Sequence, residues 1–181
     1  MNLLVYFIQI KGFFNMRILG KKKFKYINLT PQKVNNIFEK VKEIYGIHTG
    51  IDCSKIFIPE YFIIKAINMY AKKFYGQIMY INFRINLNFA RLPSYQYTLK
   101  TLAHELTHYL QWHTNRVILK GYKQYSNDTD YFKQPSEFEA EIISWFICGV
   151  NENRYKRLKG LKAGYHKLVN KVSKAKTWRH K

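Results

Sequence analysis

Two histidines four residues apart constrain the fold of this chain more than any other feature of its sequence. His104 and His108 stand in a segment, about residues 95–113, whose pattern predicts a long helix. Residues four apart lie on one face of a helix, so both imidazoles can reach a single ion, with Glu105 beside them. The opposite face carries an apolar stripe that must face the core. That stripe consists of Leu99, Leu102, Ala103, Leu106 and Leu110.

Three glutamates crowd into a second segment, which we expect to be a helix from Pro135 to about Cys148. The chain has only 11 acidic residues, yet Glu137, Glu139 and Glu141 lie almost side by side. Catalytic zinc typically takes three protein ligands and a water, and two His with one Glu is a standard set. The first and last of these glutamates share a helix face. One of them can bind the metal, and the other can accept a hydrogen bond from a ligand imidazole.

The middle glutamate, Glu139, has a different expected role. It is rotated by about 200° from Glu137 on a helix of 3.6 residues per turn, so it cannot share the site. The Ser136-x-x-Glu139 pattern is typical of a capping box at a helix N-terminus. We therefore expect replacement of Glu139 by alanine to leave zinc binding close to that of the wild type. Ala140 is small enough to let the two helices approach each other.

A strand is predicted just before the histidine helix, because residues 81–89 alternate between apolar and polar side chains without a fault. We expect it to be an edge strand of a small sheet, which could pair with an extended substrate chain. Its polar face would then line the approach to a cleft or would simply be solvated. That face consists of Asn82, Arg84, Asn86 and Asn88.

Two helices are predicted earlier in the chain. Thr30 can cap a helix over residues 31–45, and Gly46 suits its exit. Residues 60–75 also have a helical pattern that would end at Gly76, although Tyr-Phe-Ile-Ile within it could be a strand. Together with the strand over 81–89, these elements predict an α+β fold.

The charge of the chain is lopsided, and 31 Lys and Arg against 11 acidic residues give a formal charge of +20. Such a charge favours anionic partners, including nucleic acid or an acidic surface, although biased composition alone could produce it. Residues 151–181 are especially basic, with Glu152 as their one acid. We expect a domain over residues 1–150 and a basic C-terminal helical extension over 151–181. An apolar seam would dock the extension: Leu158, Leu161, Tyr165, Leu168 and Val172.

The expected location is the cytoplasm. Residues 1–15 are apolar but lack the basic start and the cleavage site of a secretory signal, and Met16 could be the true start. No apolar run approaches the roughly 20 residues that a membrane span needs. Cys53 and Cys148 lie far apart and in no metal-type spacing, so a reducing compartment is the default.

The motif His-Glu-Leu-Thr-His at 104–108, followed by Glu-Phe-Glu-Ala-Glu at 137–141, resembles the gluzincin branch of zinc metallopeptidases. It is similar to ImmA/IrrE-type peptidases and to compact phage-encoded relatives. The resemblance covers about residues 78–149. It implies a zincin-like fold in which the sheet, the histidine helix and the glutamate helix follow one another, with a helical C-terminal half.

The resemblance also implies a role for each motif residue. His104, His108 and Glu137 would bind Zn²⁺, and Glu141 would orient an imidazole, at a position where that pattern often has Asp or Asn. The implied activity is that of an intracellular endopeptidase acting on proteins or peptides. Zinc would lower the pKa of its bound water, and Glu105 would act as the general base.

The sequence leaves two questions open, the function class and the donor to the oxyanion. A rival interpretation is a basic nucleic-acid-binding protein whose metal site is not catalytic. Structural zinc sites are closed and Cys-rich, whereas two His and one Glu leave an open position, which favours the peptidase. A transition-state oxyanion usually receives a further donor. The candidates for that donor are Tyr122, Tyr125, Tyr131 and His166.

Overall fold

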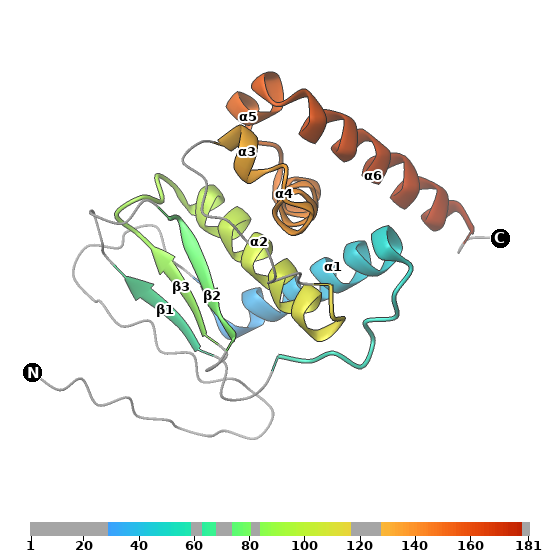
Figure 1. Ribbon diagram of the computed structural model, residues 1–181. Helices are drawn as coiled ribbons and strands as arrows, with labels where there is room; N and C mark the ends of the chain where they lie inside the picture. The colour runs from blue at the N-terminus through green and yellow to red at the C-terminus, as the bar shows by residue number, and fades with distance from the viewer. Residues whose placement is uncertain (1–28, 59–62, 68–73, 81–83, 117–127, 179–181) are drawn as a thin grey trace, which may run out of the picture.

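A small sheet packs on one side of a long central helix, and further helices pack on its other side (Figure 1). This computed structural model describes residues 29–58, 63–67, 74–80, 84–116 and 128–178 and has an α+β architecture. Its elements are α1 (Pro31–Thr49), β1 (Ile63–Ile67), β2 (Gly76–Met79), β3 (Arg84–Asn88), α2 (Tyr95–His113), α3 (Asp128–Tyr131), α4 (Pro135–Cys148), α5 (Glu152–Arg157) and α6 (Lys159–Trp178).

Helix α2 is the central helix. It contacts β2 and β3 of the sheet, the helix α1 and above all α4, while α6 packs on α4 and α1. Apolar side chains from these elements form a continuous core, in which Leu102, Leu106 and Trp145 are fully buried. Since α2 lies between the sheet and α4, side chains of all three can meet along it.

The strand before α2 is not an edge strand, so that prediction is wrong. Among the described residues the sheet has the order β1-β3-β2, with β1 parallel and β2 antiparallel to β3. Both backbone edges of β3 are therefore used by its neighbours, and it cannot pair with a further chain. Its polar side chains are not solvated either, because Asn86 and Asn88 are buried and Asn88 donates to the carbonyl of Phe74. Asn82 lies outside the described residues.

The helix predicted over residues 60–75 is also wrong where the structure describes it. Residues 63–67 are strand β1, and Gly76 begins strand β2 instead of ending a helix. The sequence Ile-Ile-Lys-Ala-Ile is rich in β-branched residues, which fit a pleated surface. Pairing with β3 then decides between two patterns that a short apolar run cannot distinguish. Residues 59–62 and 68–73 lie outside the described part.

Helix α1 begins as predicted and ends four residues later than expected. The hydroxyl of Thr30 accepts from the backbone N–H of Lys33 at 3.2 Å. The exit is at Gly50, which has a left-handed φ of 80° and whose N–H donates to the carbonyl of Gly46. Only the second glycine adopts the conformation that ends a helix, so Gly46 is an ordinary helical residue.

The bounds predicted for α2 and α4 are confirmed. Ser94 caps α2 by accepting from the backbone N–H of Tyr97. The capping box expected from Ser136 and Glu139 is not formed, since the residue preceding the helix is Gln134. Pro135 occupies the first helical position, which its fixed φ and missing N–H favour, and this places Ser136 inside the first turn.

The basic C-terminal segment folds back onto the rest of the chain. Helices α5 and α6 place Leu158, Leu161, Leu168 and Val172 in the same core as α4, and Tyr165 is packed against it. The exposed residues of α6 include five lysines: Lys159, Lys162, Lys167, Lys171 and Lys174. The arrangement is that of a docked helix with a solvated basic face. No described helix is both long enough and apolar enough to cross a lipid bilayer.

Two glycines of α6 allow a direct test of how closely this helix packs. A Cβ at Gly164 would overlap the ring of Phe138 on α4, whereas one at Gly160 would meet no described atom within 4 Å. Gly164→Ala should therefore lower the free energy of unfolding by about 1–3 kcal/mol through overpacking. Gly160→Ala, the matched control, should raise it by up to about 1 kcal/mol, because alanine restricts the unfolded chain. Urea denaturation of both variants measures the difference; equal effects would contradict the close contact.

Candidate metal centre

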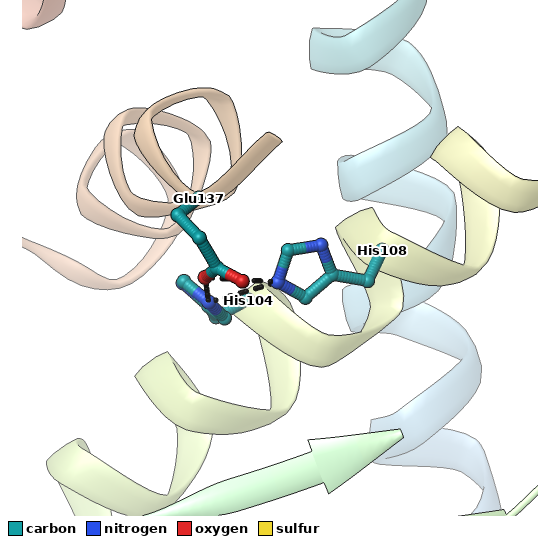
Figure 2. A group of neighbouring side chains, drawn as sticks. All are labelled: His104, His108 and Glu137. Atoms are coloured by element: carbon teal, nitrogen blue, oxygen red, sulfur yellow. Dashed lines mark hydrogen bonds and ion pairs between the residues drawn. The ribbon is translucent and has the colours of Figure 1, made fainter. Parts of the chain in front are cut away.

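Three side chains from α2 and α4 converge on one point (Figure 2). The Nε2 atoms of His104 and His108 lie 3.1 Å apart, and Oε2 of Glu137 lies 3.1 Å from the first and 3.2 Å from the second. All three residues are less than 9% exposed. The prediction that Glu137 lies beside both imidazoles is confirmed. In the part of the chain that the structure describes, this is the group of residues able to hold a metal ion.

The spacing of these atoms suits a small divalent ion. Ligand atoms about 2.0–2.2 Å from a tetrahedral zinc lie roughly 3.3–3.6 Å from one another. The observed separations of 3.1–3.2 Å are close to this. Two imidazole nitrogens and one carboxylate oxygen are also a donor set that zinc accepts. The residues present therefore fit such an ion by both chemistry and spacing.

Glu141 orients the first imidazole. Its Oε2 lies 3.3 Å from Nδ1 of His104, and its Oε1 accepts from Arg154 at 2.8 Å and from the indole of Trp145 at 2.9 Å. An ionised carboxylate can only accept, so Nδ1 of His104 must carry the proton. The other nitrogen, Nε2, then faces Glu137. The two glutamates that share a face of α4 thus lie on opposite sides of the same imidazole.

The second imidazole is held by a residue that the sequence reasoning missed. Nδ1 of His108 lies 2.7 Å from Oε1 of Gln111, which is completely buried. Gln111 also donates to the carbonyl of Ser136 and to Oε2 of Glu139. Its position three residues after His108 could have indicated the contact, because such residues are neighbours on a helix.

Glu139 belongs to a buried cluster of polar contacts and forms no capping box, which corrects the role expected for it. It is 6% exposed, and its Oε1 lies 2.9 Å from Arg116 and 3.4 Å from His48. Burial alone would raise the pKa of this carboxyl, but hydrogen bonds from His48 and Gln111 and the charge of Arg116 hold it below its usual value. The rotation that separates Glu139 from Glu137 points it at the C-terminal ends of α1 and α2, where these partners lie.

Glu105 is buried between the metal group and the sheet. Its carboxylate accepts from the backbone N–H of Ile78 on β2, and burial raises its pKa. Strand β2 passes very close at this point, since a Cβ at Gly76 would lie 2.5 Å from Thr101 and 3.0 Å from Glu105. Glycine is thus required where the strand crosses α2. Glu105 is not part of the metal-holding group, in agreement with a role other than ligand.

The buried carboxylates of the site favour a positive charge close to them. The buried carboxylates of Glu137 and Glu141 face the two imidazoles, with Glu105 nearby. Burial acts to lower the pKa of His104, but its hydrogen bonds to the carboxylates of Glu137 and Glu141 outweigh this effect and raise that pKa to about 10. The pKa of Glu137 is held well below its usual value by the imidazoles. Buried carboxylates persist only when paired, and a divalent ion between the ligand atoms meets that need as protons on the imidazoles do.

Of the two candidate donors that the structure describes, Tyr131 lies at the site. Its hydroxyl, at the end of α3, donates to Oε2 of Glu137. His166 is exposed on α6 and bonds the hydroxyl of Tyr155. Tyr122 and Tyr125 lie outside the described residues.

Comparison of the chain with models of protein families, with curated proteins and with solved structures finds no match.

Proposed function

We propose that the protein is a zinc-dependent peptidase of the gluzincin type, with a zincin-like fold. The observation that carries the proposal is the convergence of His104, His108 and Glu137 on one point, with a hydrogen-bond partner behind each imidazole. Partners of this kind are characteristic of imidazoles that bind metals, because they fix the tautomer and the ring orientation. The order of β3, α2 and α4 along the chain supports the fold part of the proposal.

Each residue of the site has its own role in the proposed hydrolysis. His104, His108 and Glu137 would hold the zinc, which lowers the pKa of a water molecule and polarises the peptide carbonyl. Glu105 accepts a proton from the attacking water and passes it to the leaving amine, a task that suits a buried carboxylate with a raised pKa. Tyr131 presents its hydroxyl beside the metal group and is our choice for the donor to the developing oxyanion.

Zinc content and peptide hydrolysis test the proposal together. We expect the wild-type protein to bind about one zinc ion per chain and to cleave an unfolded protein substrate. His108→Ala removes a ligand and should lose both zinc and hydrolysis. His113→Ala is the control on the same helix, because His113 is exposed and lies outside the metal group. Wild-type protein without zinc, or a His108→Ala variant that keeps it, would contradict the proposal.

The exposed basic face of α5 and α6 favours a second candidate function. The exposed side chains of these helices include Lys156, Arg157, Lys159, Lys162 and Lys167, with Glu152 as the one exposed acid among their described residues, so this face suits a phosphate backbone. In that case the protein is a nucleic-acid-binding protein with a metal site that is not catalytic. The same measurements separate the two functions: such a protein would bind zinc through His108 and would cleave no peptide.

A further inference from the structure

The hydrogen bonds around His108 determine which of its nitrogens must carry a proton. Oε1 of Gln111, 2.7 Å from Nδ1 of His108, is an amide oxygen and can only accept. Nδ1 of His108 must therefore carry a proton and donate it. This arrangement leaves Nε2, the atom that faces His104 and Glu137, as the nitrogen available to a metal.

The orientation of the Gln111 amide is itself determined by its surroundings. Its NH₂ group lies 2.9 Å from the carbonyl of Ser136 and 2.8 Å from Oε2 of Glu139. Both of these atoms are acceptors, so the NH₂ group must face them and the amide oxygen must face His108. A flipped amide would place its oxygen against both of these acceptor oxygens and would present N–H groups to Nδ1 of His108.

The two carboxylate oxygens of Glu139 have different partners. Oε2 receives the NH₂ group of Gln111, whereas Oε1 meets Arg116 at 2.9 Å and His48 at 3.4 Å. The carboxylate is buried, and the interaction of an amide with a charged acceptor is stronger than with a neutral one. Oε2 of Glu139 therefore orients the amide of Gln111, and Oε1 pairs the negative charge of the carboxylate with Arg116.

We propose that Gln111 and Glu139 are positioning residues for the metal centre, which hold His108 with Nδ1 protonated and Nε2 free to bind the ion. The proposal rests on the metal site proposed above. His104 is held by a carboxylate directly, while His108 is held by a neutral amide that a carboxylate orients. The glutamate that has no place in the ligand set thereby acts on the metal through two hydrogen bonds.

The test compares two variants that each remove one side of Glu139. Glu139→Gln takes away the charge that orients Gln111, whereas Arg116→Gln removes only the ion pair on Oε1. Zinc affinity, measured by competition with a chelator, should fall about tenfold or more in Glu139→Gln, as for other residues that orient a ligand. Arg116→Gln should change it by less than about threefold, because a half-exposed ion pair contributes little. The thermal stability of the metal-free protein should fall in both variants.

A reciprocal exchange makes the test specific. In Gln111→Glu/Glu139→Gln the introduced carboxylate can accept from His108, and the introduced amide can donate to that carboxylate. The double variant should bind zinc more tightly than Gln111→Glu alone, which sets two carboxylates against each other. It should not regain the full wild-type affinity, because an oxygen of the introduced carboxylate faces the carbonyl of Ser136. Equal zinc affinity in Glu139→Gln and Arg116→Gln, or a double variant that binds zinc no better than Gln111→Glu alone, would overturn the positioning role while leaving the metal site in place. Wild-type protein that binds no zinc would overturn both.

Discussion

Replacement of Glu105 by glutamine should lower peptide hydrolysis by about 10²–10⁴-fold while the protein keeps its zinc. Glutamine has nearly the same shape and can remain beside the N–H of Ile78, but it cannot take up a proton from water. Glu105 lies outside the metal-holding group, so ligand atoms are not lost. Initial rates on a quenched fluorescent peptide and zinc content measured on the same preparation give both quantities.

The control for this change is Glu152→Gln, which removes one negative charge from an exposed position on α5. It should leave both hydrolysis and zinc content unchanged. Loss of zinc from Glu105→Gln would mean that Glu105 is a ligand. Turnover near that of the wild type would mean that it is not the general base. Either result would contradict the role proposed for this residue.

Zinc affinity should fall more when Glu137 is replaced by alanine than when Glu141 is. Glu137 supplies one of the three converging atoms, and its loss leaves two imidazoles to hold the ion. Within the metal-holding group Glu141 contacts only Nδ1 of His104, so its loss should cost about 10–100-fold in affinity, and the loss of Glu137 should exceed this. Chelator competition measures all the dissociation constants on one scale.

The structure changes what is expected of Glu139 in this series. The sequence predicts near-normal zinc binding for Glu139→Ala, but the buried contact with Gln111 predicts a measurable loss. Arg116→Gln is the control within the same cluster. A larger loss for Glu141→Ala than for Glu137→Ala would reverse the roles of the two glutamates and leave the metal site itself intact.

Helix periodicity is the part of this protein that the sequence determines by itself. The apolar stripe around Leu102 and Leu106 predicts one face of α2 that enters the core, and the four-residue spacing puts His104 and His108 together on another face, which α4 also buries. The bounds of α2 and α4 follow from local signals at Ser94 and Pro135. All of these relations act within one helix, so no knowledge of the neighbouring elements is needed.

The sequence pointed to Glu137 because acidic residues are scarce in this chain. Few carboxylates occur in this basic chain, so three of them in one short helix required an explanation. Helical geometry then separated Glu137 and Glu141 from Glu139. Which of the first two faces both imidazoles depends on how α4 is rotated against α2, and the structure determines this.

The pairing of the strands and several hydrogen-bond partners of the site were decided by the tertiary structure. Residues 63–67 become a strand because β3 offers them a partner, and β3 is central because β1 and β2 both pair with it. Glu139 and Tyr131 matter through contacts between different helices, which leave no periodic signal in the sequence. The orientation of the Gln111 amide likewise depends on Ser136 and Glu139 of α4. Local spacing can place two ligands on one helix face, but hydrogen bonds between elements exist only once the elements have packed together.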